Sequence, residues 1–203
     1  GKKSLGLVGD SIAASSNDSN QANQSGAFLK GNQYGALGAF KRAFTIAGYP
    51  YFSAAVPSSY AGMEVRYGGG LLRQHVVRGS SALVSEHVHN DAFQVTTLGE
   101  LQTVLKAYWA TMRAAIPTST KLVAVTPSPT TAEVSNSDWN ARTSGAQSMS
   151  GQFIYPTGIA YTYRDYLMGT LDPADGDPDA VLDFAQYISN SLTGSFVAID
   201  GLW

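Results

Sequence analysis

Short apolar runs alternate with longer stretches of helical periodicity along most of this chain. Each run is bounded by Gly, Pro or polar residues, which is the pattern of buried β-strands. Five strands are predicted, at residues 5–8, 51–56, 82–88, 121–126 and 180–184. A further short apolar segment covers residues 196–199.

Helical periodicity is clearest in the middle of the chain. Thr97 is followed three residues later by Glu100, which is the form of a capping box. One apolar face then continues to Pro117 through Leu98, Leu101, Leu105, Tyr108, Met112 and Ala115. A second helix is predicted from the face made by Leu37, Phe40, Phe44 and Ala47, which Gly48 and Pro50 end. Weaker helical patterns cover residues 63–77 and 159–168.

Polar residues without periodicity fill residues 13–32 and 127–156, and both stretches are expected to be irregular surface loops. Strands that alternate with helices favour right-handed crossovers and a mostly parallel sheet with helices on both faces. We therefore expect a three-layer α/β/α sandwich of the flavodoxin-like kind. One domain over residues 1–203 is expected, because 44% of the residues are apolar and the length suits one core.

The amino-acid composition excludes several kinds of site and of partner. The chain has no cysteine, which excludes disulfides, Cys-ligated zinc and a thiol nucleophile. Its net charge of -2 gives no electrostatic reason to expect nucleic acid or an anionic membrane as partner, and no apolar run is long enough to span a bilayer. Few charged residues (14%) and many Gly, Ser, Thr, Asn and Gln favour a soluble extracellular or virion-associated protein with a neutral or sugar-like ligand.

Two chemically suggestive segments directly follow predicted strands. These are Gly9-Asp10-Ser11 and His89-Asn90-Asp91. The carboxyl ends of parallel strands meet at one edge of the sheet, where ligands bind, so we expect the two segments to lie together. A serine there is exposed for nucleophilic attack if a base takes its proton. An Asn amide is a preorganised oxyanion donor, a type of contribution worth roughly 3 kcal/mol in acyl transfer.

Each segment also has an ordinary interpretation. Gly, Asp and Ser all favour turns, and an Asn-Asp pair after a strand often forms an Asx turn or opens a helix. Their joint occurrence, in order and each at a predicted strand end, favours the functional interpretation.

These segments resemble the motif blocks of the SGNH (GDSL-like) hydrolase family. Residues 5–12, Leu-Gly-Leu-Val-Gly-Asp-Ser-Ile, match its first block, a strand followed by Gly-Asp-Ser. Residues 83–91 resemble its third block, a strand followed by Gly-x-Asn-Asp, with Val88 in place of the glycine. The helix that ends before Pro117 and the strand at residues 122–127 are similar to the next elements of the family fold. The resemblance implies an esterase in which Ser11 is the nucleophile, and in which Asn90 and the Ser11 N–H hold the oxyanion.

The other two blocks depart from the family pattern. The second block has a glycine whose N–H joins the oxyanion hole, and residues 54–59 have none, so Ser58 is the aligned donor. The last block is Asp-x-x-His, which supplies the base and its orienting carboxylate. Here Asp200 is present, but Trp203 stands where the histidine would be. We expect the sequence to stop short of a full Asp-x-x-His; the alternative is that the base has been lost.

The three histidines differ in what they are expected to do. His75 is interpreted as a surface or packing residue, and His87, placed on the third strand, as structural. His89 lies beside Asn90 and is a candidate substrate contact and the only plausible substitute base. No spacing of His and carboxylate residues is typical of a metal site, and no phosphate-binding Gly-rich loop is present, so we expect no metal and no cofactor.

The sequence thus predicts hydrolysis of an ester, and the resemblance implies O-acetyl groups on carbohydrate. The expected partner is a small-molecule or polysaccharide ester, and the chain could belong to a larger protein or an oligomer. The alternative is a non-catalytic carbohydrate-binding or structural domain of a larger surface or phage tail protein. A histidine close to Ser11 would distinguish the two.

Overall fold

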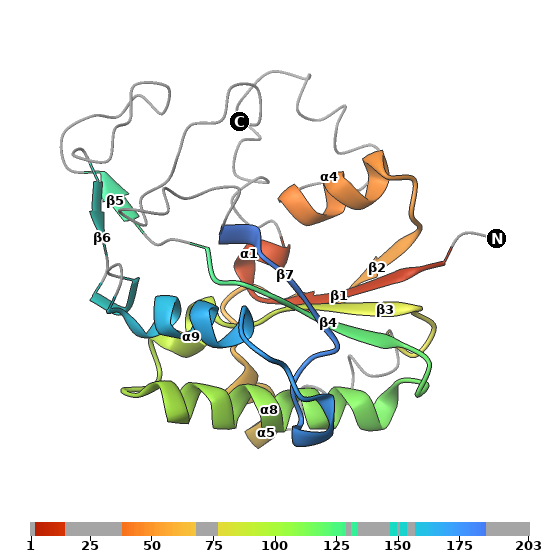
Figure 1. The fold of residues 1–203 in the computed structure, drawn as a ribbon. Helices are drawn as coiled ribbons and strands as arrows, with labels where there is room; N and C mark the ends of the chain where they lie inside the picture. Colours follow the sequence, from red (N-terminus) through yellow and green to blue (C-terminus); the bar gives the residue numbers. More distant parts are fainter. Residues whose placement is uncertain are drawn as a thin grey trace, which may run out of the picture.

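A five-stranded parallel sheet forms the centre of the molecule (Figure 1). The structure is a computed structural model that describes residues 3–14, 38–67, 77–128, 131–133, 147–149, 151–153 and 157–185. The strand order is β2-β1-β3-β4-β7. The strands are β1 (Leu5–Gly9), β2 (Tyr51–Ser53), β3 (Ala82–Glu86), β4 (Lys121–Val125) and β7 (Ala180–Leu182). Each predicted strand within the described residues is present, and every pairing in this sheet is parallel.

Helices cover both faces of the sheet, which confirms the predicted α/β/α sandwich. In Figure 1, α1 (Ser11–Ala14) and α4 (Gly38–Ile46) lie on one side. On the other side are α5 (Ala61–Tyr67), α8 (Leu98–Ala115) and α9 (Ile159–Leu167). The short helix α7 (His89–Ala92) follows β3, and two 3-10 turns are η4 (Gly151–Phe153) and η5 (Pro173–Asp175).

Strand register sorts the apolar side chains into two cores. Leu7, Val84 and Val123 are register partners on adjacent strands, and they pack on the α4 side with Phe40. Because successive side chains of a strand point to opposite faces, their neighbours Val8, Leu83 and Leu122 face the other layer. There they meet the buried face of α8, which includes Leu101, Leu105, Tyr108, Trp109 and Met112.

Helix α8 begins at the capping box that the sequence predicts. The Glu100 N–H donates to the Thr97 side chain over 3.2 Å, and the Thr97 N–H donates to the Glu100 carboxylate over 3.1 Å. Both bonds satisfy N–H groups that the first turn of a helix leaves without a partner. The helix ends at Ala115, directly before Ile116 and Pro117.

Several predicted boundaries are wrong. Strand β2 ends at Ser53 and β3 at Glu86, since the chain then turns, and β7 ends at Leu182. Residues 13 and 14 are helical rather than irregular, and residues 15–37 lie outside the described part. Within the polar stretch at 127–156, β5 (Thr131–Glu133) and β6 (Gln147–Met149) form an antiparallel pair. Of the stretch at 63–77, residues 63–67 lie in α5, and residues 68–76 lie outside the described part.

Several positions singled out in the sequence lie outside the described residues: His75, the segment 196–199, Asp200 and Trp203. Among the helices that are described, none combines the length and the apolar character needed to cross a bilayer.

Candidate active site

The two motifs that follow β1 and β3 lie at one edge of the sheet, at the point where the strand order reverses. From β1 the chain crosses to β2 on one side, and it then returns to β3 on the other side of β1. Gly9 at the end of β1 is the register partner of Glu86 at the end of β3. In open α/β sheets, ligands bind outside the carboxyl ends of the strands at such a switch point.

The turn between β1 and α1 is tightly packed. A Cβ on Gly9 would lie 2.7 Å from the Ala13 Cβ and 2.9 Å from a Glu86 carboxylate oxygen, so only glycine fits here. Asp10 is fully buried, and its Oδ1 accepts a hydrogen bond of 2.8 Å from the Ile12 N–H. Ser11, the predicted nucleophile, is the first residue of α1, and its side chain lies outside what the structure describes.

The loop after β2 contains a β-turn that brings Ser58 to this edge. The Ser59 N–H donates to the Val56 carbonyl over 3.2 Å, so Pro57 and Ser58 occupy the two central positions. Ser58 has a φ of 62°, the left-handed value that a type II turn requires there and that glycine adopts most easily. The serine thus takes a glycine-like conformation at the position where the sequence lacks the expected glycine.

The turn is fastened to the end of β1 through the Gly9 carbonyl. That oxygen accepts a hydrogen bond from the Val56 N–H over 3.0 Å and another from the Ser59 hydroxyl over 3.2 Å. The loop that contains Ser58, the predicted oxyanion donor, is therefore hydrogen-bonded to the residue at which the chain turns towards Ser11.

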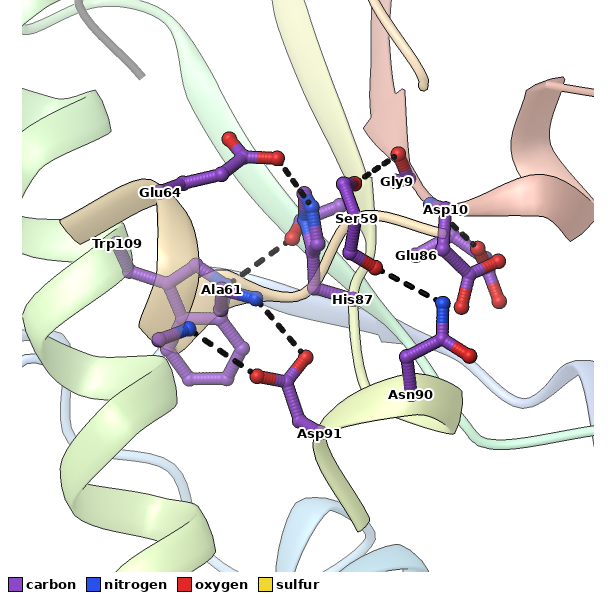
Figure 2. A network of polar contacts seen from close by, with 12 residues as sticks. Gly9, Asp10, Ser59, Ala61, Glu64, Glu86, His87, Asn90, Asp91 and Trp109 are labelled. Carbon is purple, nitrogen blue, oxygen red and sulfur yellow. Dashed lines mark hydrogen bonds and ion pairs between the residues drawn. The ribbon is translucent and has the colours of Figure 1, made fainter. Parts of the chain in front are cut away.

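Two adjacent residues of α7 hold the other end of the same loop (Figure 2). The Asn90 amide donates to the Ser59 carbonyl over 2.9 Å. The Asp91 carboxylate accepts the N–H of Ala61 over 3.1 Å and that of Gly62 over 3.2 Å. Burial raises the pKa of Asp91 above its ordinary value, although nearby His87 and these two N–H groups act in the opposite direction. Asn90 is thereby oriented within the site, while Asp91 joins α7 to the start of α5.

His89 is the first residue of α7 and lies partly buried beside Asn90. Its ring packs edge-on against Phe93, with 5.7 Å between ring centroids. Burial lowers the pKa of His89, while the charge of Asp10 raises it, and the net shift is downward. The imidazole is therefore mostly neutral near pH 7, which is the form that can accept a proton.

His87 is placed differently from the sequence prediction. It lies in the turn after β3 rather than on the strand, and it is buried. Its Nε2 is 3.1 Å from Oε1 of Glu64 on α5, and its ring packs against Tyr108 of α8 with 4.4 Å between centroids. These contacts agree with the structural role predicted for it.

A pair of buried carboxyl groups at this edge was missed by the sequence reasoning. Glu86 ends β3, is 4% exposed, and lies beside Asp10. Burial raises the pKa of Glu86 well above its ordinary value of 4.5, and the neighbouring Asp10 charge and hydrogen bond raise it further. The sequence does contain a signal for this pair, because Glu86 is an acidic residue in a strand whose other residues are apolar or small.

The structure thus brings the Ser11 turn, Ser58, His89 and Asn90 to one edge of the sheet, while Asp200 lies outside the described residues. Within the described ranges, no group of three or more His, Asp or Glu side chains has an arrangement that could hold a metal ion.

Known structures share this architecture. A protein described as a possible lipase from Chitinophaga pinensis has a TM-score of 0.56 and 14% identity, over 97% of this chain and 78% of that one. A protein described as a GDSL-like lipase, from Parabacteroides merdae, has a TM-score of 0.50 and 14% identity, over 98% of this chain and 91% of that one. The fold is that of a GDSL-like lipase. The resemblance seen in the motifs therefore extends to the α/β/α fold as a whole.

The similarity also has clear bounds. The psychrotrophic esterase EstA from Pseudoalteromonas sp. aligns with a TM-score of 0.40 and 16% identity, over 62% of this chain. The chain spans only 60% of the length of EstA. No protein-family model matches the sequence, and neither does any curated protein. At these identities the GDSL-like likeness defines the fold, and function has to be argued from the site.

Proposed function

We propose that this chain is a serine ester hydrolase in which Ser11 is the nucleophile. The observation that carries the proposal is the hydrogen-bonded assembly of three segments at the switch point of a GDSL-like fold. The Ser11 turn, the Ser58 turn and α7 are joined through the Gly9 carbonyl and through the bond from Asn90 to Ser59. Each segment contributes a group that acyl transfer requires.

In the proposed reaction, the Ser11 hydroxyl attacks the acyl carbon, its proton passes to a base, and the carbonyl oxygen becomes an oxyanion. The oxyanion then collapses, the alcohol leaves with that proton, and water hydrolyses the acyl group from Ser11. The backbone N–H groups of Ser11 and Ser58 donate to the oxyanion, together with the Asn90 amide. An Asn amide has two hydrogens, and one of those in Asn90 bonds the Ser59 carbonyl, which orients the other. Donors that are held before the reaction begins stabilise the developing charge without further reorganisation.

Attack by the Ser11 hydroxyl requires a base that takes its proton. The family pattern assigns it to a histidine oriented by Asp200, and the sequence has Trp203 at that position. Neutral His89 beside Asp10 is the substitute base that the described residues offer. Because Trp203 stands where the family has its histidine, a non-catalytic carbohydrate-binding domain is the second candidate function.

For the substrate we propose O-acetyl groups on carbohydrate. The resemblance to GDSL-like esterases supports this class, as do the stretches at 13–32 and 127–156, which are rich in Ser, Thr, Asn and Gln. Hydroxyl and amide side chains suit a sugar ligand because they both donate and accept hydrogen bonds.

Labelling with a fluorophosphonate followed by mass spectrometry tests the nucleophile. We expect an adduct on Ser11 that is absent from Ser11→Ala. Ser4→Ala is the matched control, since the Ser4 hydroxyl bonds the Gly79 carbonyl away from the site, and it should label like the wild type. Adducts at another serine, with Ser11 unmodified, would contradict the assignment.

A further inference from the structure

Asp10, in the turn that carries Ser11, and Glu86, at the end of β3, form a pair of buried carboxyl groups. Asp10 is 0% exposed and Glu86 is 4% exposed. The Asp10 N–H lies 3.4 Å from a Glu86 oxygen, at the outer limit of a hydrogen bond. The same Glu86 oxygen would be 2.9 Å from a Cβ on Gly9, so the carboxyl group is packed against the backbone of the turn. Figure 2 draws Asp10 and Glu86 with the contact from the Asp10 N–H to the Glu86 carboxyl group.

Two adjacent buried carboxyl groups are not both ionised, because neither charge is solvated and the charges repel. Oδ2 of Asp10 is buried and has no hydrogen-bond partner among the described residues. A proton on Glu86 supplies that missing donor. Burial, and then the charge of Asp10, raise the pKa of Glu86 well above its ordinary value, in agreement with a protonated Glu86.

Asp10 also forms hydrogen bonds with the backbone at the start of α1, and so links Glu86 to that helix. Its other carboxylate oxygen accepts the Ile12 N–H over 2.8 Å, and the Ala14 N–H donates to its carbonyl over 2.8 Å. The residue between Asp10 and Ile12 is Ser11. Whatever fixes Asp10 therefore also fixes the backbone on both sides of the nucleophile.

We propose that protonated Glu86 is a positioning residue for Ser11: it donates a hydrogen bond to the Asp10 carboxylate, accepts the Asp10 N–H, and so holds the turn between β1 and α1. The proposal rests on the proposed function, in that the reaction it serves is that of Ser11. Glu86 does not contact substrate, and it acts through Asp10.

This arrangement makes the site sensitive to pH. When Glu86 loses its proton, a second buried negative charge faces Asp10, the hydrogen bond is lost, and the turn loosens. The reactivity of Ser11 should then fall on the alkaline side. Among the described residues, the other titratable groups that face this pair are His89 and Asp91 of α7, so the alkaline fall has to be assigned by substitution.

Three variants and a control test the proposal. Glu86→Gln keeps a donor and an acceptor but cannot ionise, while Glu86→Met keeps the volume and loses both. Asp10→Asn keeps an acceptor for Ile12 and offers a donor to an ionised Glu86. The control is Asp165→Asn, which removes an exposed carboxylate on α9. The rate of fluorophosphonate labelling at Ser11 is followed from pH 6 to 10, together with hydrogen exchange of the Asp10 and Ile12 amides.

We expect Glu86→Met to label at least tenfold more slowly than the wild type and to exchange these two amides faster. Glu86→Gln should label at close to the wild-type rate near neutral pH, and both Glu86→Gln and Asp10→Asn should lack the alkaline fall. Wild-type labelling by Glu86→Met, or an unchanged alkaline fall in Glu86→Gln, would overturn the proposal. If Glu86→Met does not fold, the pH profile of Glu86→Gln decides alone.

The failure of the proposed function gives a different result. In that case Ser11 is unlabelled in every protein, including the wild type, and the exchange data decide the positioning role. Faster exchange in Glu86→Met than in Glu86→Gln would support it, and equal exchange in all variants would refute it.

Discussion

Ser58 has a backbone conformation that only glycine adopts without strain, with a φ of 62°. Left-handed values cost an ordinary residue roughly 1–2 kcal/mol, and a β-branched residue more. We therefore expect Ser58→Val to lower the free energy of unfolding by at least about 1 kcal/mol. Ser58→Gly should be close to neutral, because the relief of strain is offset by the larger entropy of glycine in the unfolded chain.

Urea denaturation of the two Ser58 variants measures this difference. Equal stability of the valine and glycine variants would show that the turn does not hold the left-handed conformation in solution.

Asn90 is predicted to act on the transition state. Asn90→Ala removes one oxyanion donor, so we expect kcat for p-nitrophenyl acetate to fall by about a hundredfold with little change in KM. Stability is measured in parallel, since the variant also loses the bond to the Ser59 carbonyl. If kcat is unchanged in a folded variant, Asn90 serves only to hold the loop.

The sequence singled out residues whose signal is local and missed those whose contacts depend on distant partners. Gly9, Ser11 and Asn90 stand directly after apolar strands, which is visible in a single window. Glu86 acquires its role from Asp10, and Asp91 from two N–H groups on α5. These contacts join segments that are far apart in the sequence, and no periodicity encodes them.

At the scale of elements, the cap of α8 offers a test of local stability. Thr97→Ala removes the acceptor of the Glu100 N–H, and loss of an N-cap side chain costs about 1 kcal/mol. The matched control is Thr103→Ala, in the interior of the same helix, where alanine is the better helix former. We expect the free energy of unfolding to fall only for Thr97→Ala. A similar loss in both variants would mean that the capping box contributes nothing specific.

Strand and helix types were predicted well, whereas their ends were not. Two strands were predicted too long, as far as Val56 and Val88, because a sequence does not distinguish an apolar residue in a strand from one in a buried turn. In the structure, Val88 is 1% exposed although it lies in the turn before α7, where the core of α8 covers it. Val56 begins the turn that carries Ser58. Both strands end where the chain leaves the sheet to build the site.

At the scale of the whole molecule, the buried carboxyl groups predict how stability depends on pH. Glu86 has a higher pKa in the folded than in the unfolded chain, so the folded state binds more protons above its ordinary value of 4.5. Its contribution to the free energy of unfolding therefore decreases as the pH rises from about 4.5 towards the folded pKa. Asp91 acts in the same direction, and His89, whose pKa is lowered, acts oppositely just below pH 6.5.

Comparison with Glu86→Gln isolates this contribution. The stability of the variant relative to the wild type should increase steadily as the pH rises from 5 to 9, as measured by urea denaturation at each pH. A constant difference over this range would mean that the protonation of Glu86 does not change on unfolding.

The sheet topology also has a kinetic consequence. Leu5 pairs with Tyr51 on one side and with Ala82 on the other, so the first strand made has no partner until the chain has been synthesised well past it. Contacts between distant segments must first close long loops, which makes parallel sheets slow to fold. Because the site is built from the ends of β1 and β3 and the loop after β2, it cannot form before these strands have paired. The nucleophile therefore reaches its place only once β1 has paired with both β2 and β3, so the first 50 residues alone cannot assemble the site.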